Sequence, residues 1–371
     1  MNIGINGYEA VVPRFGFNKD GLPNRVGSGE FCYQLLVALS KIDKKNNYFI
    51  YLPTQPTSDM PKESAKWQYV AFSSKKLWTL FGLSRKLMKN PQSLDVFFNP
   101  THYSPITKIK KVISILDVSY LHFKNLFNKK DLYQLKYWGR YSIGQSKKIL
   151  TISETSKNDI IKAYRLRPNA VEVVYPGIKE NKMSDVDLGS KYKVSDKYIL
   201  FVGTLQPRKN IRRLVEAFSK LDTDNELVIV GKKGWQYEEI LNSPKEFGVE
   251  NKVKFLENVS EEDLAMFYKN ALFLVLPSLY EGFGLPVIEA MSYGCPVITS
   301  DISSLPEAGG EAAMYVDPEN VDDIYEKMKK LLTDEDLRKK MIEKGKEQAK
   351  KFSWEKAAKE TLNVLEGVVN G

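Results

Sequence analysis

Two glutamates stand eight residues apart in the second half of the chain, within a stretch that is rich in glycine and proline. The stretch reads Pro277-Ser278-Leu279-Tyr280-Glu281-Gly282-Phe283-Gly284-Leu285-Pro286-Val287-Ile288-Glu289. A carboxylate accepts hydrogen bonds from two adjacent hydroxyls, so Glu281 and Glu289 together suit an extended, hydroxyl-rich ligand. Two glutamates at this spacing alone would more often be solvated, but the glycines and the proline between them favour a binding site.

The residues between the two glutamates predict a phosphate site at the start of a helix. The stretch follows an apolar run, 272–276, that is typical of a strand, and open α/β sheets bind ligands at the carboxyl ends of their strands. Gly282 and Gly284 allow the backbone to come close to a ligand. Pro286 suits the first position of a helix over 287–293, and Gly294 suits its end. The free N–H groups at such a helix start attract a phosphate.

A basic pair, Arg208 and Lys209, follows another predicted strand, 198–202. Two cations that are held in place in advance suit a ligand that carries negative charge, such as a phosphate. Taken alone, the pair would more often belong to a solvated loop. Arg212 and Arg213, one helical turn further on, are interpreted as surface residues.

At these residues the chain resembles the retaining GT-B glycosyltransferases of family 4, whose signature is two glutamates separated by seven residues. The resemblance rests on four segments, which are Glu281–Pro296, Phe201–Asn210, Val230–Trp235 and Val174–Gly177. It covers nearly all of the second half and, more weakly, the first. It implies two Rossmann-like domains whose parallel sheets face a central cleft, and transfer of a sugar with retention of its anomeric configuration.

The resemblance also implies a role for each residue of the site. Glu281 would hold the hydroxyls of the donor sugar, Glu289 those of the ribose, and Arg208 with Lys209 the diphosphate. The amides around Phe283–Leu285 would face the sugar and the distal phosphate. The other expected donor-binding residues are Gly203 and Thr204 in the first loop, Gly282 and Gly284, and a base pocket formed by 231–233 with Asn258 and Val259.

In the first half, Gly27-Ser28-Gly29 resembles the family's glycine-rich loop, in which Gly29 would present a backbone amide to the diphosphate. A plain turn at the start of a helix is the alternative. The run fails as a dinucleotide fingerprint, because Cys32 stands where the third glycine would be and no strand directly precedes it. A nicotinamide-dependent oxidoreductase is therefore disfavoured.

The strand expected over 112–116 runs into Asp117, which is the candidate catalytic residue on the acceptor side, beside Glu281 on the donor side. Family members often carry His-Asp here, but this chain has Leu116 in place of the histidine. Either that histidine is dispensable, or His102 or His122 replaces it from a neighbouring loop. A structural role for both histidines is an equally good interpretation.

Short apolar runs alternate with helical patterns along the whole chain, which predicts α/β architecture with parallel sheets covered by helices. The polar stretch 179–197 separates two halves of similar size. We therefore expect an N-terminal, acceptor-side domain over 1–178 and a C-terminal, nucleotide-sugar-binding domain over 190–352. The helix within 353–371 is expected to return to the first domain.

The charge of the chain is divided unevenly between its halves. Residues 1–180 contain 28 Lys and Arg against 13 Asp and Glu, whereas 181–371 contain 27 against 33. A basic half suggests an anionic partner, either a membrane surface or a nucleic acid. The segment 73–88, drawn as a helix, has basic residues on or beside one side, as in helices that lie on membranes. Its other side would carry Leu77, Leu80, Phe81, Leu87 and Met88. A helix packed on the sheet is the alternative.

The resemblance implies a hexosyltransferase with a glycan or lipid-linked glycan as the acceptor. Because 203–210 and 232–235 are similar to the same segments of mannosyltransferases, mannose from GDP-mannose is the expected donor. Glucosyl, galactosyl or rhamnosyl transfer from a UDP- or dTDP-sugar is the alternative, and a basic nucleic-acid-binding protein is the alternative of another class. No cofactor and no metal are expected, since no Asp-x-Asp dyad stands at a strand end. The two cysteines and the absence of a signal-like start predict a cytoplasmic protein, peripheral on the inner face of the membrane.

Overall fold

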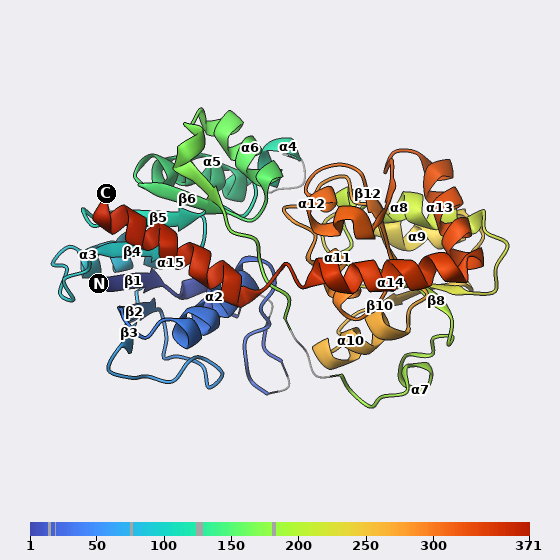
Figure 1. Cartoon of the computed structure of the whole chain (residues 1–371), viewed down its shortest axis with the longest axis horizontal. Helices are drawn as coiled ribbons and strands as arrows, with labels where there is room; N and C mark the ends of the chain where they lie inside the picture. The colour runs from blue at the N-terminus through green and yellow to red at the C-terminus, as the bar shows by residue number, and fades with distance from the viewer. Residues whose placement is uncertain (14–15, 19, 75–76, 124–128, 180–182) are drawn as a thin grey trace. The chain divides into compact units, whose positions relative to one another are not determined.

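The computed structural model describes residues 1–13, 16–18, 20–74, 77–123, 129–179 and 183–371. The chain forms two compact units, one made of Met1–Gly177 with Ser353–Gly371 and the other of Ile178–Phe352 (Figure 1). In the part of the chain that is described, no helix combines the length and the apolar composition needed to cross a bilayer.

The first unit is built on a seven-stranded sheet in the order β3-β2-β1-β4-β5-β6-β7, in which every pairing is parallel. The strands are β1 Asn2–Asn6, β2 Asn47–Leu52, β3 Trp67–Ala71, β4 Val96–Asn99, β5 Lys110–Ser114, β6 Lys148–Thr151 and β7 Val171–Val173. All four residues of β4 are buried. A strand covered on both faces needs apolar residues on both, which is why these segments read as continuous apolar runs.

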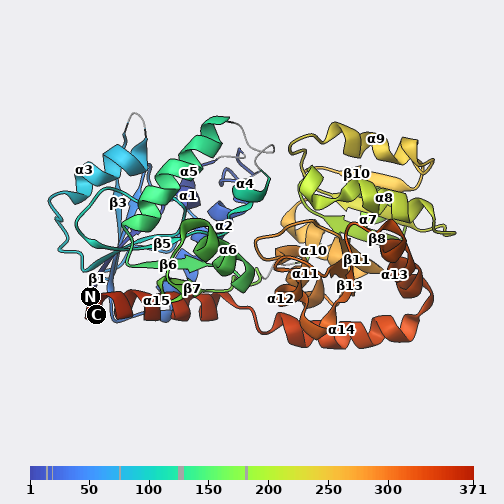
Figure 2. The same ribbon diagram turned by 90° about the horizontal axis from the view of Figure 1, so that it is seen from above.

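Helices cover both faces of this sheet (Figure 2). They are α1 Tyr8–Val11, α2 Ser28–Ile42, α3 Ser84–Leu87, α4 Ser119–His122, α5 Lys129–Gly144, α6 Glu154–Tyr164 and α15 Trp354–Asn370, and Pro168–Ala170 forms a 3₁₀ turn. Ser353 caps α15 by accepting a hydrogen bond from the Lys356 N–H. Helix α15 lies against α2, and Ala357, Ala358 and Leu365 are fully buried in the same core as residues of β1 and β2.

The second unit contains a six-stranded parallel sheet in the order β10-β9-β8-β11-β12-β13. Its strands are β8 Tyr198–Val202, β9 Glu226–Val230, β10 Val253–Leu256, β11 Phe273–Leu276, β12 Val297–Ser300 and β13 Met314–Val316. The predicted α/β architecture with two parallel sheets is confirmed. Strand β13, at the edge, is an addition that the sequence did not predict.

The helices of the second unit also lie on both faces of its sheet, with α8 and α14 on opposite sides (Figure 2). They are α7 Leu188–Tyr192, α8 Ile211–Ser219, α9 Glu238–Glu246, α10 Glu261–Asn270, α11 Leu285–Ser292, α12 Leu305–Gly309, α13 Val321–Thr333 and α14 Glu335–Ala349, with 3₁₀ turns at Pro207–Lys209 and Gly310–Ala312. The buried carboxylate of Asp263, on α10, accepts hydrogen bonds from Ser184, Lys191 and Tyr192. These bonds attach the segment that contains α7 to this unit.

The expectation of one apolar side on a regular helix over 73–88 is wrong for the residues from Leu77 onwards, and residues 75 and 76 lie outside the described part of the chain. Residues Trp78–Leu83 form a π-helical turn before α3, so successive residues rotate by less than the 100° of an α-helix. As a result Leu87 is fully buried, whereas Phe81 and Met88 are exposed. The indole of Trp78 is buried too, and its Nε1 donates a hydrogen bond of 2.9 Å to the Phe72 carbonyl.

Candidate active site

The loops after β8 and β11 meet at the carboxyl edge of the second sheet, because these two strands are neighbours. The Leu279 N–H donates a hydrogen bond of 2.8 Å to the carbonyl oxygen of Arg208, which joins the two loops through their backbones. The buried amide of Asn210 donates to the carbonyl oxygens of Pro277 (3.0 Å) and Pro318 (2.6 Å). The segment that carries Arg208 and Lys209 is therefore held against the segment that carries Glu281.

Glu281, Arg208 and Lys209 form one cluster of charges. A terminal nitrogen of Arg208 lies 3.1 Å from one carboxylate oxygen of Glu281, and the Lys209 ammonium donates to the other. The same Arg208 nitrogen donates to the Tyr280 carbonyl over 2.7 Å. Glu281 is 6% exposed and Lys209 7%, so this ion pair is shielded from water. The structure thus brings together three residues that the sequence predicted to act together, although 72 positions separate Lys209 from Glu281.

The charge state of Glu281 follows from its neighbours. Burial alone would raise the pKa of its carboxyl group, but the positive charges of Lys209 and Arg208 outweigh this effect and lower the pKa to about 2. Glu281 is therefore an anion at any physiological pH. The three side chains together carry one net positive charge, which suits a site for an anionic ligand.

The backbone of Glu281 is fixed as firmly as its side chain. Its N–H donates to the Ser303 hydroxyl over 3.1 Å, and the hydroxyls of Ser303 and Ser304 both donate to its carbonyl oxygen over 2.8 Å. Ser303 adopts a left-handed backbone conformation, with φ of 60°, in the loop between β12 and α12. Sequence reasoning missed these two serines, because the stretch that contains them has no spacing that points to Glu281.

The glycine-rich turn leads into α11 as predicted from the sequence, although the helix begins two residues earlier. Gly284 caps the helix with φ of 113°, and a Cβ there would lie 2.9 Å from Leu305 Cδ2, so the turn requires glycine. The ring of Phe283 is 2% exposed and packs edge-on against Phe352, with 5.1 Å between centroids. Phe283 can therefore contribute its backbone to a ligand, but its side chain belongs to the core. Gly282 and Leu285 are half-buried beside it.

Glu289 lies on α11, and its side chain is held by the neighbouring helix α10. The hydroxyl of Tyr268 donates a hydrogen bond of 2.9 Å to Oε2 of Glu289. Tyr268 is fully buried, and its ring stacks on that of Tyr293, with centroids 5.9 Å apart and planes 7° apart. Glu289 itself is half-buried, so this carboxylate combines a fixed orientation with partial access to solvent.

The loop after β8 is supported by the loop after β9. The Gly203 N–H donates to the Val230 carbonyl and the Leu205 N–H to the Lys232 carbonyl, each over 2.9 Å. Thr204, between them, is exposed. Val259 follows β10 and is half-buried, and β9 lies between β10 and β8 in the sheet. The base pocket predicted from 231–233 and 258–259 would therefore span the ends of β9 and β10.

Gly231 packs directly against the backbone of the loop after β8, and we expect Gly231→Ala to displace that loop. A Cβ at Gly231 would lie 1.9 Å from the Gly203 carbonyl oxygen, a backbone atom that cannot move without shifting the loop that leads to Arg208. The variant should lose about 1–3 kcal/mol of unfolding free energy, measured by chemical denaturation, and bind nucleoside diphosphate more weakly. The matched control is Gly367→Ala, where a Cβ meets nothing within 4 Å on helix α15. That variant should be neutral or slightly more stable. Equal stability of the two variants would contradict the prediction.

The candidate residues of the first half lie in the first unit, in the segments that follow β1, β4 and β5. Gly29 is buried in the first turn of α2, where a Cβ would lie 3.1 Å from the Glu9 carbonyl oxygen. Its N–H donates to the Val26 carbonyl over 3.2 Å. The close packing on Glu9 gives this glycine a structural reason, whereas its predicted contact with a diphosphate stays a prediction.

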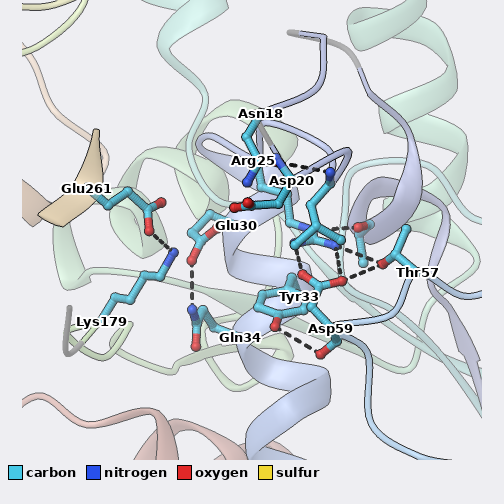
Figure 3. Close-up of polar contacts among 12 residues, drawn as sticks. Asn18, Asp20, Arg25, Glu30, Tyr33, Gln34, Thr57, Asp59, Lys179 and Glu261 are labelled. Carbon is cyan, nitrogen blue, oxygen red and sulfur yellow. Dashed lines mark hydrogen bonds and ion pairs between the residues drawn. The ribbon is translucent and has the colours of Figure 1, made fainter. Parts of the chain in front are cut away.

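Arg25 anchors the chain just before this glycine loop (Figure 3). Its guanidinium forms an ion pair with Asp59 (2.5 Å), donates to the Thr57 hydroxyl (3.1 Å) and to the Ala10 carbonyl (2.6 Å), and lies 3.9 Å above the ring of Tyr33. Charged groups that are buried in this way are stable only when they are fully paired. Sequence reasoning missed Arg25, which fixes the position of the chain two residues before Gly27.

Asp117 follows β5, and its carboxylate accepts a hydrogen bond of 2.8 Å from the Ser119 N–H at the start of α4. Leu116, at the position of the family's histidine, is 8% exposed and belongs to the core. The Nε2 atom of His102, in the loop after β4, lies 3.4 Å from the Asp117 carbonyl oxygen. Of the two histidines weighed as substitutes, His102 thus lies next to Asp117, and the side chain of His122 lies outside the described residues.

Comparison with known proteins agrees with this geometry. Residues 189–348 match the family model of glycosyl transferases group 1. O-antigen chain mannosyltransferase B of Escherichia coli is 32% identical over 279 residues, which are 72% of this chain and 73% of that protein. Sucrose-phosphate synthase from Thermosynechococcus elongatus has a similar fold, with a TM-score of 0.72 and 16% identity over 99% of both chains.

A second solved structure, Anabaena HepE in complex with UDP and glucose, superposes with a TM-score of 0.72 at 16% identity, covering 99% of this chain and 100% of that one. These likenesses identify the fold as GT-B, which confirms the fold class predicted from the sequence. The chain belongs to the glycosyl transferases group 1 family and is a nucleotide-sugar-dependent glycosyltransferase.

Proposed function

We propose that this enzyme transfers mannose from GDP-mannose to a glycan or lipid-linked glycan, with retention of the anomeric configuration. The observation that carries the proposal is the buried cluster of Glu281, Arg208 and Lys209 at the carboxyl edge of the second sheet. The choice of mannose is supported by the Escherichia coli relative, which is a mannosyltransferase by name. Retention and membership of family 4 are supported by the spacing of Glu281 and Glu289.

The charges of the cluster suit the breaking of a bond to a nucleoside diphosphate. Arg208 and Lys209 would neutralise the diphosphate as it leaves, and the amides at the start of α11 would bind its distal phosphate. Glu281, which is ionised and held by its backbone, would accept hydrogen bonds from the hydroxyls of the donor sugar. Glu289 would accept hydrogen bonds from the ribose.

The proposed reaction needs no enzymic nucleophile. The acceptor oxygen forms a bond to the anomeric carbon on the face from which the diphosphate leaves, and the bond from that carbon to the phosphate oxygen breaks. The proton of the acceptor hydroxyl passes to the departing phosphate oxygen. Asp117, together with His102 beside it, is the candidate group on the acceptor side.

A panel of nucleotide sugars tests the donor. GDP-mannose should raise the melting temperature of the purified chain more than UDP-glucose, UDP-galactose or dTDP-rhamnose, because only the correct base and sugar fill the site. NMR of the transferred sugar then reports the anomeric configuration. A larger shift with a UDP- or dTDP-sugar would overturn mannose and favour glucosyl, galactosyl or rhamnosyl transfer. An inverted product would overturn retention. Membership of the family leaves the nucleic-acid-binding alternative without support.

We expect transfer to need no divalent metal, because protein cations and the start of α11 would carry the charge of the diphosphate. The rate should be unchanged after dialysis against EDTA and should not rise when manganese or magnesium is added. Loss of activity in EDTA that manganese restores would contradict this expectation.

We further propose that the enzyme takes its acceptor at an anionic membrane. Two segments of the first unit, 77–88 and 133–141, carry six exposed apolar or tyrosine side chains, namely Leu77, Phe81, Met88, Tyr133, Tyr137 and Tyr141. We call these two segments the aromatic face. A groove of about 490 Å³ lies between the segments and is lined by Leu77, Leu80, Tyr133, Gln134, Tyr137 and Trp138.

The charges around the aromatic face favour an anionic lipid surface. Residues 77–89 contain three basic residues and no acidic one, and 132–144 add Lys136 and Arg140 without any acidic residue. Tyrosine is enriched where proteins meet the headgroups of a bilayer, and basic side chains extend towards anionic lipids. The membrane contact predicted from 73–88 would thus include α5, which the sequence did not indicate.

Sedimentation with vesicles tests this surface. Replacing Tyr133 and Tyr137 together by serine should reduce binding to vesicles that contain anionic phosphatidylglycerol by at least about ten-fold, since it removes apolar area from the interface. The matched control is Trp235→Ser, whose side chain is 51% exposed in the second unit, against 54% for Tyr137. Equal binding of both variants, or equal binding of the wild type to neutral vesicles, would contradict the proposal.

A further inference from the structure

Tyr268 is a buried residue in contact with Glu289, and the proposed function gives it no role. It lies on α10, and its hydroxyl donates to Oε2 of Glu289, on α11, over 2.9 Å. The ring is 1% exposed and is fixed by its parallel stacking on Tyr293. One side of the Glu289 carboxylate is therefore bound to a side chain that has almost no freedom to move.

A buried tyrosine needs an acceptor for its hydroxyl, but that acceptor need not be a carboxylate. In the same unit, the hydroxyl of Tyr198, on β8, has a backbone carbonyl as its acceptor. It is also 1% exposed, and its hydroxyl donates to the Phe267 carbonyl oxygen over 2.9 Å. The two tyrosines are equal in burial and in hydrogen-bond length, and they differ in that the hydroxyl of Tyr268 orients a half-buried carboxylate at the site.

The direction of this hydrogen bond is fixed by the chemistry of its partners. Burial, and then the negative charge of Glu289, raise the pKa of Tyr268 well above its usual value, so the phenol stays protonated and acts as the donor. A hydrogen bond to an ionised group is stronger than one between neutral groups. It restrains the rotation of the Glu289 carboxylate about its terminal bond.

We propose that Tyr268 is a positioning residue for nucleotide binding, which fixes the Glu289 carboxylate so that it accepts hydrogen bonds from both hydroxyls of the ribose. The inference rests on the proposed function, in which Glu289 binds the ribose. Tyr268 itself does not touch the ligand. Its hydroxyl orients the carboxylate before the donor arrives, so that binding does not have to restrict that rotation.

Calorimetric binding of GDP and of its 2′,3′-dideoxy analogue to the full chain separates positioning from a structural role. Tyr268→Phe should bind GDP about ten-fold more weakly than the wild type, which is the effect of losing one well-oriented hydrogen bond to a charged group. The same variant should bind the dideoxy analogue as the wild type does, because that ligand has no ribose hydroxyl for Glu289 to accept from. In transfer assays the KM for GDP-mannose should rise while kcat changes little.

Tyr198→Phe is the matched control, since it also removes one buried tyrosine hydroxyl and leaves Glu289 untouched. It should bind both ligands normally. In Glu289→Gln, adding Tyr268→Phe should weaken GDP binding much less than it does in the wild type. Equal losses for GDP and its dideoxy analogue would reduce Tyr268 to a structural residue, and unchanged GDP binding by Tyr268→Phe in an active enzyme would also overturn the inference. If the wild type binds GDP and UDP equally weakly and transfers no sugar, the proposed function fails, and the inference fails with it.

Discussion

Glu281→Gln should reduce glycosyl transfer by at least about 10³-fold, because it removes the negative charge that both cations of the cluster contact and that would bind the donor sugar. The amide keeps the size of the side chain but can no longer neutralise Lys209, which is 7% exposed. Removing one partner of a buried ion pair costs about 3–5 kcal/mol, so the variant should also melt at a lower temperature. Steady-state kinetics and thermal denaturation measure the two effects.

The structure adds a sharper expectation for this variant. A nucleoside diphosphate brings negative charge to the two cations, so GDP should raise the melting temperature of Glu281→Gln by more than it raises that of the wild type. The matched control is Glu250→Gln at an exposed position of the same unit, which should behave as the wild type does. A folded Glu281→Gln enzyme with full activity would contradict the assignment of the site.

The same residue has a consequence for stability in acid. The pKa of Glu281 is about 2 in the folded chain, below the ordinary value of 4.5, so its ionised form stabilises the fold. This stabilisation is complete above about pH 4.5 and is lost as the pH falls towards 2. Over that interval the wild type should lose more unfolding free energy than Glu281→Gln, which has no carboxylate to protonate at this position.

Lys209→Met should weaken donor binding and slow transfer together, lowering kcat/KM by about 10²- to 10³-fold. The methionine keeps the length of the side chain and removes the charge that would hold the diphosphate in both the ground state and the transition state. Because the positive charge of Lys209 is the largest of the effects that lower the pKa of Glu281, that pKa should rise in the variant. Steady-state kinetics with varied GDP-mannose would show a higher KM and a lower kcat.

Two further variants test whether the loss of donor binding and transfer is specific to the cations of the cluster. Lys220→Met is the matched control, because Lys220 pairs with Asp322 at the surface and should leave the kinetics unchanged. Arg208→Ala should act in the same direction as Lys209→Met. Unchanged kinetics in both Arg208→Ala and Lys209→Met would mean that the cationic site lies elsewhere.

Much of this site could be predicted because its residues lie at the ends of easily recognised strands. The apolar runs of β8 and β11 are unbroken, and parallel neighbours place the loops that follow them at one edge. Arg208, Lys209 and Glu281 could therefore be brought together without coordinates. The direct ion pair could not be predicted, since it depends on how two loops pack and on the backbone contacts of Ser303 and Ser304.

The features that sequence reasoning missed show no periodic pattern of apolar residues and no motif of fixed spacing. Strand β13 has three residues, too few for a strand pattern. The π-helical turn at 78–83 changes the rotation per residue, so a helix drawn at 100° put Leu87 on the wrong side. Tyr268 is an ordinary apolar position of α10, and its bond to Glu289 depends on the packing of α10 against α11. The role of Arg25 could not be predicted from the sequence either, because the residues that it contacts lie in three separate segments.

The return of α15 to the first unit affects the order in which the chain can fold. Ala357, Ala358 and Leu365 help to fill the core that surrounds β1, yet the ribosome makes them only after all of residues 178–352. The second unit is continuous and can complete its own core during synthesis. Until α15 has been synthesised, the apolar surface of the first unit that α15 later covers stays exposed to solvent. A chain that ends at residue 352 and has been released from the ribosome should therefore contain a protease-resistant second unit and a first unit that chaperones still bind.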